Sequence, residues 1–363
     1  MQTNNGSCPF VQAVIKQSRA NILITYALST ILLKRITVNI QTALLGIVCF
    51  CCICCSENKT NDRASEFTIL RFDTDLYHYL TQNGSDSFLL NHKDFLNLFG
   101  DSILAIGNSD SSGFFPRLKM YFSEPTLMRM YKDEQEKFSD LTQINKELSK
   151  GLHVFFQHFP GINRPKVYMH VSGLYQNIVV TDRILSLSAD KYLGSDYPLY
   201  QDYIYDYRRQ LMRPDRIVPD YLLGFMMANF KFKGDEDVLL DRMLYEGKLR
   251  YMLSKLLSRQ HAWEYVGYDK EQYEWCSRHE SLIWKTILEN HQLFTADYST
   301  TTQYINDAPF TAALPVESPG RVGIWLGFQI ISAYMKQKPD TGWQELMNNT
   351  DYEEILKQSK YKP

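Results

Sequence analysis

The sequence predicts a mainly helical α+β fold with a small antiparallel sheet. Two short segments, 166–172 and 183–190, alternate apolar and polar side chains, which is the period of a half-buried strand, and residues 178–181 between them read as a further strand. The chain on both sides of them has helical propensity, and its apolar residues recur at helical spacing. Of the 363 residues, 44% are hydrophobic and 13% aromatic, so the chain is able to bury a large core.

The predicted elements follow one another in a simple order. Regular structure is expected to begin near residues 67–73, and residues 74–151 read as helices joined by loops. The three strands are then predicted at residues 166–172, 178–181 and 183–190. Residues 220–230 are apolar on nearly every side, which predicts a buried helix.

Three further helices are predicted towards the C-terminus. Residues 235–257 form a long amphipathic helix, and residues 271–289 form another with Leu282 on its inner side. Ser318 is the predicted cap of the last one, with proline in its first turn. Three glycines share a face there, where a second backbone is expected to approach closely: Gly320, Gly323 and Gly327.

The N-terminal region carries an uncharged apolar run that begins at Ala43 and ends in a cysteine cluster at Cys55. Lys34 and Arg35 precede it, and the chain turns polar at once after it. Basic residues, an apolar core and a cysteine at the exit are typical of a bacterial lipoprotein signal. Cys55 is the predicted lipidation site and first mature residue, although Cys52 stands where leucine is usual in this motif.

A transmembrane anchor is the alternative, because residues 36–55 are about long enough to cross a bilayer. Polar residues crowd the first third of that segment, which favours the signal. A second apolar segment lies at residues 21–33. It indicates either an extra short membrane segment or a true start near residue 32, and we favour the later start.

The predicted organisation has three parts: N-terminal apolar segments with the signal (residues 1–55), a polar tether (56–65), and a single globular domain (66–363). Six of the seven cysteines lie at or before Cys55, so the domain has no disulfide framework and no cysteine–histidine zinc finger. The net charge of −2 provides no basic field, and no nucleic-acid partner is expected.

The order of strands, buried helix and long helix resembles that of gluzincin zinc peptidases. Their active helix carries His-Glu-x-x-His, which places two imidazoles on zinc and a glutamate beside the bound water. His279 and Glu280 begin this motif, but Ile283 stands at the second histidine position. The expected architecture is therefore a degenerate gluzincin-like one, with no catalytic residue, no metal and no cofactor.

Other reactive groups have plainer interpretations. Cys276 and His279 share a helix face, but a buried, inert cysteine is the favoured interpretation. Glu246, beside Gly247, is interpreted first as a solvated or ion-paired helix residue. Arg321, at a helix start among glycines, has the chemistry to bind a carboxylate, although a surface arginine is the favoured interpretation.

Several segments together resemble the gliding-motility-associated lipoprotein family GldB of Bacteroidota. They are residues 71–76, 192–194, 197–200, 216–220, 239–248, 275–284 and 318–327. The resemblance implies an envelope lipoprotein, and a distant relationship to predicted zinc peptidases. On that analogy Glu246 stands near the position of the acidic zinc ligand, while the histidines are missing.

The expected function is that of a non-catalytic lipoprotein, anchored in the cell envelope and facing the periplasm. It would bind a peptide or protein partner in a surviving cleft beside an edge strand at residues 166–172. The candidate cleft residues are Tyr168, His170, Glu246, Glu280 and Arg321. The alternative is a membrane-anchored hydrolase, peptidase-like, with a non-standard site.

Overall fold

The computed structural model describes residues 67–82, 89–259 and 261–363, all within one compact unit. The apolar N-terminal segments, the tether and Cys55 lie outside these residues. None of the described helices combines the length and the apolarity that crossing a membrane requires.

The sheet has four strands in the order β1-β2-β4-β3. They are β1 (Ile69–Arg71), β2 (Lys166–His170), β3 (Ile178–Val180) and β4 (Ile184–Ser188). The three strands predicted between residues 166 and 190 are confirmed, and so is the mainly helical α+β class. The sheet is mixed, however: β1 and β4 both run parallel to β2, and only β3 and β4 are antiparallel.

The segment between β2 and β3 is a fixed loop and does not form a hairpin turn that pairs the two strands. Gly173 and Leu174 both have positive φ angles, +71° and +66°. The carboxylate of Asp190 fixes this loop, accepting hydrogen bonds from the backbone N–H groups of Ser172 at 3.2 Å and Leu174 at 2.6 Å. β3 therefore does not pair with β2, and β4 pairs with β2 instead.

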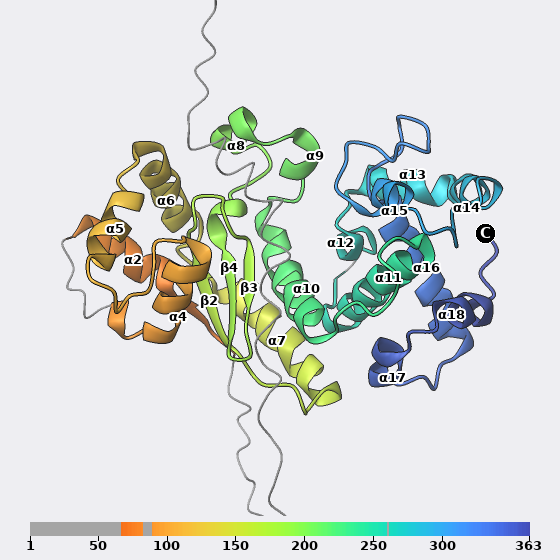
Figure 1. Cartoon of the computed structure of the whole chain (residues 1–363), viewed down its shortest axis with the longest axis horizontal. Helices are drawn as coiled ribbons and strands as arrows, with labels where there is room; N and C mark the ends of the chain where they lie inside the picture. Colours follow the sequence, from red (N-terminus) through yellow and green to blue (C-terminus); the bar gives the residue numbers. More distant parts are fainter. Residues whose placement is uncertain (1–66, 83–88, 260) are drawn as a thin grey trace, which may run out of the picture. The chain divides into compact units, whose positions relative to one another are not determined.

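Helices before and after the sheet cover its two faces (Figure 1). The stacked rings of Phe95 and Tyr168, 4.4 Å between centroids, join α4 to β2. On the other face, α10 approaches the sheet so closely that a Cβ on Gly224 would lie 2.7 Å from Ile178. The N-terminal helices are α2 (Phe72–Thr81), α4 (Lys93–Leu98), the π-helical η1 (Phe99–Ile103), α5 (Phe114–Tyr121), α6 (Pro125–Lys137) and α7 (Thr142–His158).

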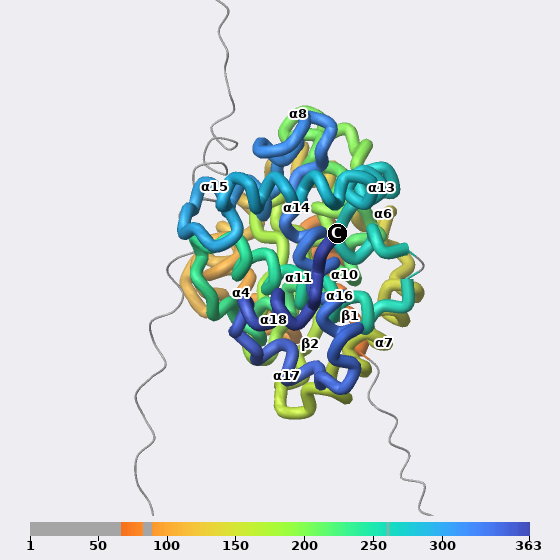
Figure 2. The backbone as a smooth tube through the Cα atoms, turned by 90° about the vertical axis from the view of Figure 1, so that its right-hand side faces the viewer, coloured from red at the N-terminus to blue at the C-terminus, as the bar shows by residue number. Residues whose placement is uncertain are grey.

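The C-terminal part is built around the pair α11 and α16. In both views α13 to α15 lie towards one end of this pair, and α17 and α18 towards the other (Figure 2). After the sheet come η2 (Ala189–Lys191), α8 (Pro198–Tyr203), α9 (Asp206–Arg209), η3 (Pro214–Arg216), α10 (Ile217–Asn229), α11 (Leu239–Leu256), α12 (Trp263–Val266), α13 (Lys270–Arg278), α14 (Glu280–Glu289), α15 (Tyr298–Ile305), α16 (Val322–Gln337), α17 (Trp343–Asn348) and α18 (Tyr352–Ser359).

The close backbone approach predicted at the three glycines is confirmed, but only Gly323 and Gly327 lie on α16, and Gly320 precedes it. A Cβ added to Gly320 would lie 2.2 Å from the carbonyl oxygen of Ala308, and one on Gly323 would lie 2.9 Å from that of Tyr304. At Gly327 the corresponding distance to the Met243 carbonyl oxygen of α11 is only 1.9 Å. The glycines therefore allow other backbone segments to pack directly on this helix.

Two predicted helix boundaries are wrong. The segment 271–289 forms two helices, because the chain leaves the helical path at His279, where φ is −111° and ψ is 17°. Leu282, predicted inside, is 42% exposed as a result. The last helix begins at Val322 instead of after Ser318, since Arg321 at its N-cap adopts a left-handed conformation.

Candidate functional site

The structure divides the predicted cleft into separate places. Tyr168 and His170 lie on β2, which has a hydrogen-bonded neighbour on each side. The prediction of an edge strand at residues 166–172 is therefore wrong, because β1 extends the sheet beyond it. Both side chains are buried against aromatic rings of α4 and η1, including those of Phe95 and Phe99.

His170 is a neutral core residue. Its Nδ1 lies 2.6 Å from the hydroxyl oxygen of Ser186 on the neighbouring strand. Burial, with a smaller contribution from the positive charge of Lys191, lowers the pKa of His170 to about 3. In the described part of the chain, no three His, Cys, Asp or Glu side chains gather closely enough to hold a metal ion.

Glu246 lies on α11 and is ion-paired along its own helix. Its carboxylate oxygens are 3.8 Å from Arg242 and 3.4 Å from Arg250, one turn before it and one turn after it. The side chain is nearly buried, with the residue 5% exposed. The interpretation of Glu246 as an ion-paired helix residue agrees with this geometry.

Arg250 pairs with Glu246 and also interacts electrostatically with two other arginines. Burial is the main cause that lowers the pKa of Arg250, and the positive charges of Arg216 and Arg321 add to it. Gly267 lies beside both of these: a Cβ placed there would be 3.4 Å from Nη1 of Arg321 and 3.6 Å from Cζ of Arg216. Two guanidinium groups therefore lie beside this glycine, and the charge of Arg250 is near enough to interact with both.

Arg216 is held in place from two sides. Its Nη2 donates to the carboxylate of Asp220 at 2.7 Å, one turn along the chain. Its Nη1 donates to the carbonyl oxygen of Glu264, also at 2.7 Å. Asp220 accepts a further hydrogen bond from the hydroxyl of Tyr192, at 2.9 Å, so this carboxylate is shared.

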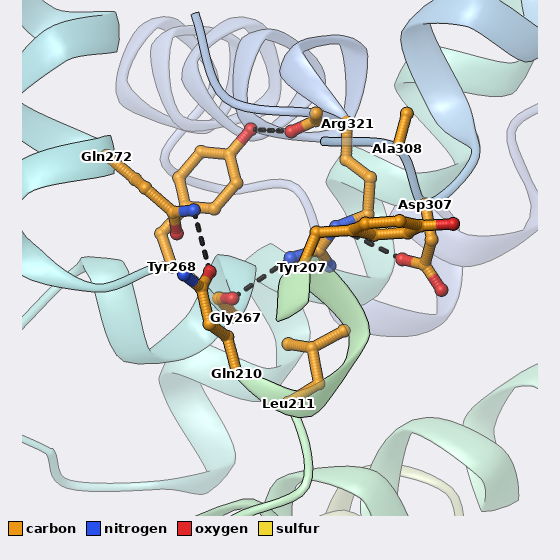
Figure 3. Close-up of a pocket in the computed structure, with 10 residues that line it drawn as sticks. Tyr207, Gln210, Leu211, Gly267, Tyr268, Gln272, Asp307, Ala308 and Arg321 are labelled. Carbon is orange, nitrogen blue, oxygen red and sulfur yellow. Dashed lines mark hydrogen bonds and ion pairs between the residues drawn. The ribbon is translucent and has the colours of Figure 1, made fainter. Parts of the chain in front are cut away.

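A small pocket opens beside Arg321 (Figure 3). It contains about 280 Å³ of space that is partly open to solvent. Most of its lining is polar, and it comes from four separate stretches of chain. The lining residues are Tyr207, Gln210, Leu211, Gly267, Tyr268, Gln272, Asp307, Ala308, Gly320 and Arg321.

The guanidinium of Arg321 points into the middle of this pocket. Its Nη2 donates to the Gly267 carbonyl oxygen at 3.0 Å, and its Nε lies 3.3 Å from Oδ1 of Asp307. The Arg321 side chain is 15% exposed and that of Asp307 is 42% exposed. A planar guanidinium fixed in this way presents the donor geometry that carboxylates and phosphates bind.

The backbone before α16 determines where Arg321 points. Arg321 has a φ of +62°, an uncommon value for a residue with a side chain. Gly320, packed against Ala308, has its carbonyl oxygen fixed by the hydroxyl of Tyr268 at 2.6 Å. This turn aims the arginine back across the helix start towards Gly267, away from the path of α16.

Glu280 and the cysteine–histidine pair do not belong to this pocket. Glu280, the first residue of α14, accepts a hydrogen bond from the hydroxyl of Tyr361 near the C-terminus. Cys276 is fully buried, and burial raises the pKa of its thiol. Nδ1 of His279 forms a hydrogen bond of 2.8 Å with the carbonyl oxygen of Trp275. This nitrogen is therefore paired with the backbone and not with the thiol, which favours the inert interpretation of Cys276.

Sequence reasoning named Arg321 and Glu246 but missed Arg216 and Arg250. One signal was available: three of the segments that carry the family resemblance, 216–220, 239–248 and 318–327, converge here. Arg250 lies just beyond the second of them. No local pattern indicated the pocket itself, because residues far apart in the chain line it.

Comparison with known proteins gives one match. A family model described as "Gliding motility protein GldB", whose short name marks its members as lipoproteins, matches residues 54–363. No curated protein and no solved structure matches the chain.

Proposed function

Because the chain belongs to the GldB family of gliding motility proteins, we propose that it is a lipid-anchored envelope protein that binds a peptide or protein partner without catalysis. The family model spans the whole described structure, which confirms the resemblance seen in the sequence. The anchor, the partner and the absence of catalysis are separate parts of this proposal, and each has its own support.

The proposed anchor is a lipid on the thiol of Cys55, with the chain facing the periplasm. The apolar run ends at this residue, and the family match begins next to it, at residue 54. Mass spectrometry of the mature N-terminus is expected to find a lipidated Cys55 as the first residue. A mature chain that still carries residues 41–54, or a Cys55→Ala variant of normal size in the membrane fraction, would contradict the anchor.

The pocket at Arg321 is the observation that supports partner binding. It combines a fixed, partly exposed guanidinium with amide and phenol groups on its walls. Such groups give orientation and specificity to a bound segment. The buried positions of Cys276 and His170 support the non-catalytic part, because neither side chain is open to a substrate.

Photo-crosslinking in native envelopes tests where the partner binds. A photoreactive residue in place of Gln210, on the pocket rim, is compared with one in place of Lys132, an exposed position on α6. We expect a crosslinked partner from the first position only, and a weaker signal when Arg321→Gln is added. Equal crosslinking from both positions, or crosslinking from Lys132 alone, would place the partner on another surface.

A further inference from the structure

We propose that the Arg321 pocket recognises an oxyanion, a carboxylate or phosphate group of the ligand, which replaces the carboxylate of Asp307 on the guanidinium of Arg321. This inference deepens the proposed function and rests on it for the claim that the oxyanion belongs to a partner. Three features of the described residues support it: the contact of Asp307, the unpaired donors of the neighbouring arginines, and the walls of the pocket.

Asp307 shows how an oxyanion lies in this pocket. Its Oδ1 is 3.3 Å from Nε of Arg321, while the carbonyl oxygen of Gly267 occupies Nη2. The Asp307 side chain is 42% exposed, and ion pairs of such exposed side chains are weak. An incoming carboxylate or phosphate that also contacts the walls would gain hydrogen bonds to offset the effective concentration of the tethered Asp307.

The arginines beside the pocket hold hydrogen-bond donors without partners. Among the described residues, Nε of Arg216 and both Nε and Nη1 of Arg250 are buried and have no acceptor. The two residues are only 5% and 9% exposed, so bulk water does not replace the missing acceptors. Buried polar groups are normally paired. Arg216 and Arg250 do not line the pocket, so they favour an anion at Arg321 through their positive charge and not through direct contact.

The local charges explain why an oxyanion would exchange with Asp307. Arg216, Arg250 and Arg321 face the carboxylates of Asp220, Glu246 and Asp307. Glu246 also pairs with Arg242, and Asp220 also accepts from Tyr192, so neither is free to neutralise Arg321. When Asp307 turns away, the site carries excess positive charge, and the oxyanion of the ligand neutralises it.

The walls place further polar groups around the guanidinium of Arg321. Gly267 has no side chain and a φ of +77°, so the backbone lies directly beside the two guanidinium groups. Gln210 and Gln272 stand at the rim, where Nε2 of Gln272 donates to Oε1 of Gln210 at 3.0 Å. These amides offer further donors to the oxygens of a carboxylate or phosphate.

Anion binding by the full chain in detergent micelles tests this inference. Thermal unfolding is followed at constant ionic strength with three probes: acetate, inorganic phosphate, and a short peptide with a free C-terminal carboxylate compared with its amide. We expect a saturable rise in Tm with at least one oxyanion. A preference for the peptide acid over its amide identifies a carboxylate, and a preference for phosphate identifies a phosphoryl group.

Three variants make the test specific. Arg321→Gln should weaken oxyanion binding at least tenfold, whereas Arg278→Gln, at an exposed arginine of α13, should leave it unchanged. Asp307→Asn alters an exposed side chain and should strengthen binding several-fold, because the internal competitor is removed. Absence of saturable binding, an equal loss in the two arginine variants, or no gain in Asp307→Asn would overturn the inference.

The outcomes also separate the two proposals. If oxyanions bind as expected but Gln210 captures no partner, the proposed partner site is wrong and the oxyanion site stands. If Gln210 captures a partner while no oxyanion binds, the partner site stands and the oxyanion inference is wrong.

Discussion

Gly247 of α11 and Gly327 of α16 meet backbone to backbone at the crossing of the two helices. A Cβ on Gly247 would lie 2.3 Å from the carbonyl carbon and oxygen of Gly327. Neither residue can carry a side chain without moving a helix. Glu246 and Arg250 are on α11 and Arg321 caps α16, so this crossing also sets the distance between the groups of the candidate site.

Gly327→Ala is expected to destabilise the fold. Its Cβ would lie 1.9 Å from the Met243 carbonyl oxygen, and a backbone atom cannot move aside as a side chain can. Overpacking of this kind typically costs about 1–3 kcal/mol, and we expect about 3 kcal/mol or more here. Gly161→Ala is the control, since its Cβ would meet nothing within 4 Å. Urea unfolding of both variants measures the difference, and similar midpoints would contradict the tight crossing.

His170 is expected to make stability depend on pH. Its pKa is about 3 in the folded chain against an ordinary value of 6.5, because burial disfavours the charged ring. Its contribution to stability is therefore complete above pH 6.5 and is lost as the pH falls towards 3. Between pH 7 and pH 5 the wild type should lose about 2 kcal/mol through this group.

The comparison for this prediction is His170→Asn, which keeps a polar atom for Ser186 and does not titrate. Its free energy of unfolding should fall less between pH 7 and pH 5 than that of the wild type, by about the same 2 kcal/mol. His78→Asn, at an exposed position, should keep the wild-type dependence. Parallel pH profiles for all three proteins would show that His170 is not held neutral.

Glu134→Gln is expected to stabilise the protein at high pH. Burial, followed by the nearby negative charge of Asp73, raises the pKa of Glu134 well above its ordinary 4.5. Because the folded pKa is raised, the contribution of Glu134 is complete below pH 4.5 and is lost as the pH rises through the folded value. The amide introduced by Glu134→Gln does not ionise, so the variant does not lose this stability as the pH rises.

The advantage of Glu134→Gln over the wild type should therefore grow from pH 5 to pH 8 in urea unfolding. Glu136→Gln, an exposed position on the same helix, is the matched control and should show no such growth. Asp73→Asn should instead destabilise, because Asp73 accepts three hydrogen bonds from Arg71, at 2.6 to 3.0 Å. A constant difference between Glu134→Gln and the wild type would show that Glu134 is ionised.

Cys276 is expected to resist alkylation in the folded protein. The thiol is fully buried and its pKa is raised by burial, so both access and the reactive thiolate are suppressed. Peptide mapping after iodoacetamide treatment should find Cys276 unlabelled under native conditions and labelled in urea. Rapid native labelling would instead support a reactive cysteine and the hydrolase alternative.

The sequence by itself determined the elements whose signal is local. Local patterning predicted the strands within residues 166–190. Apolarity on every side predicted the buried α10, and small residues predicted the close backbone approach at α16. These patterns record which side of a segment is buried, and a segment carries that information within itself. The family resemblance had the same basis, since short segments in a fixed order carried it.

Only the tertiary structure decided the sheet order and the site. Strand pairing depends on hydrogen bonds between segments, and β4 pairs with β2 without any local sign of it in the sequence. The break at His279 likewise turned Leu282 outward. The crossing of α11 and α16 at two glycines sets Arg250 near Arg321, and the packing of η3 beside Gly267 adds Arg216. Charges separated by tens of residues have no periodicity to reveal them, so their grouping is a property of the folded chain.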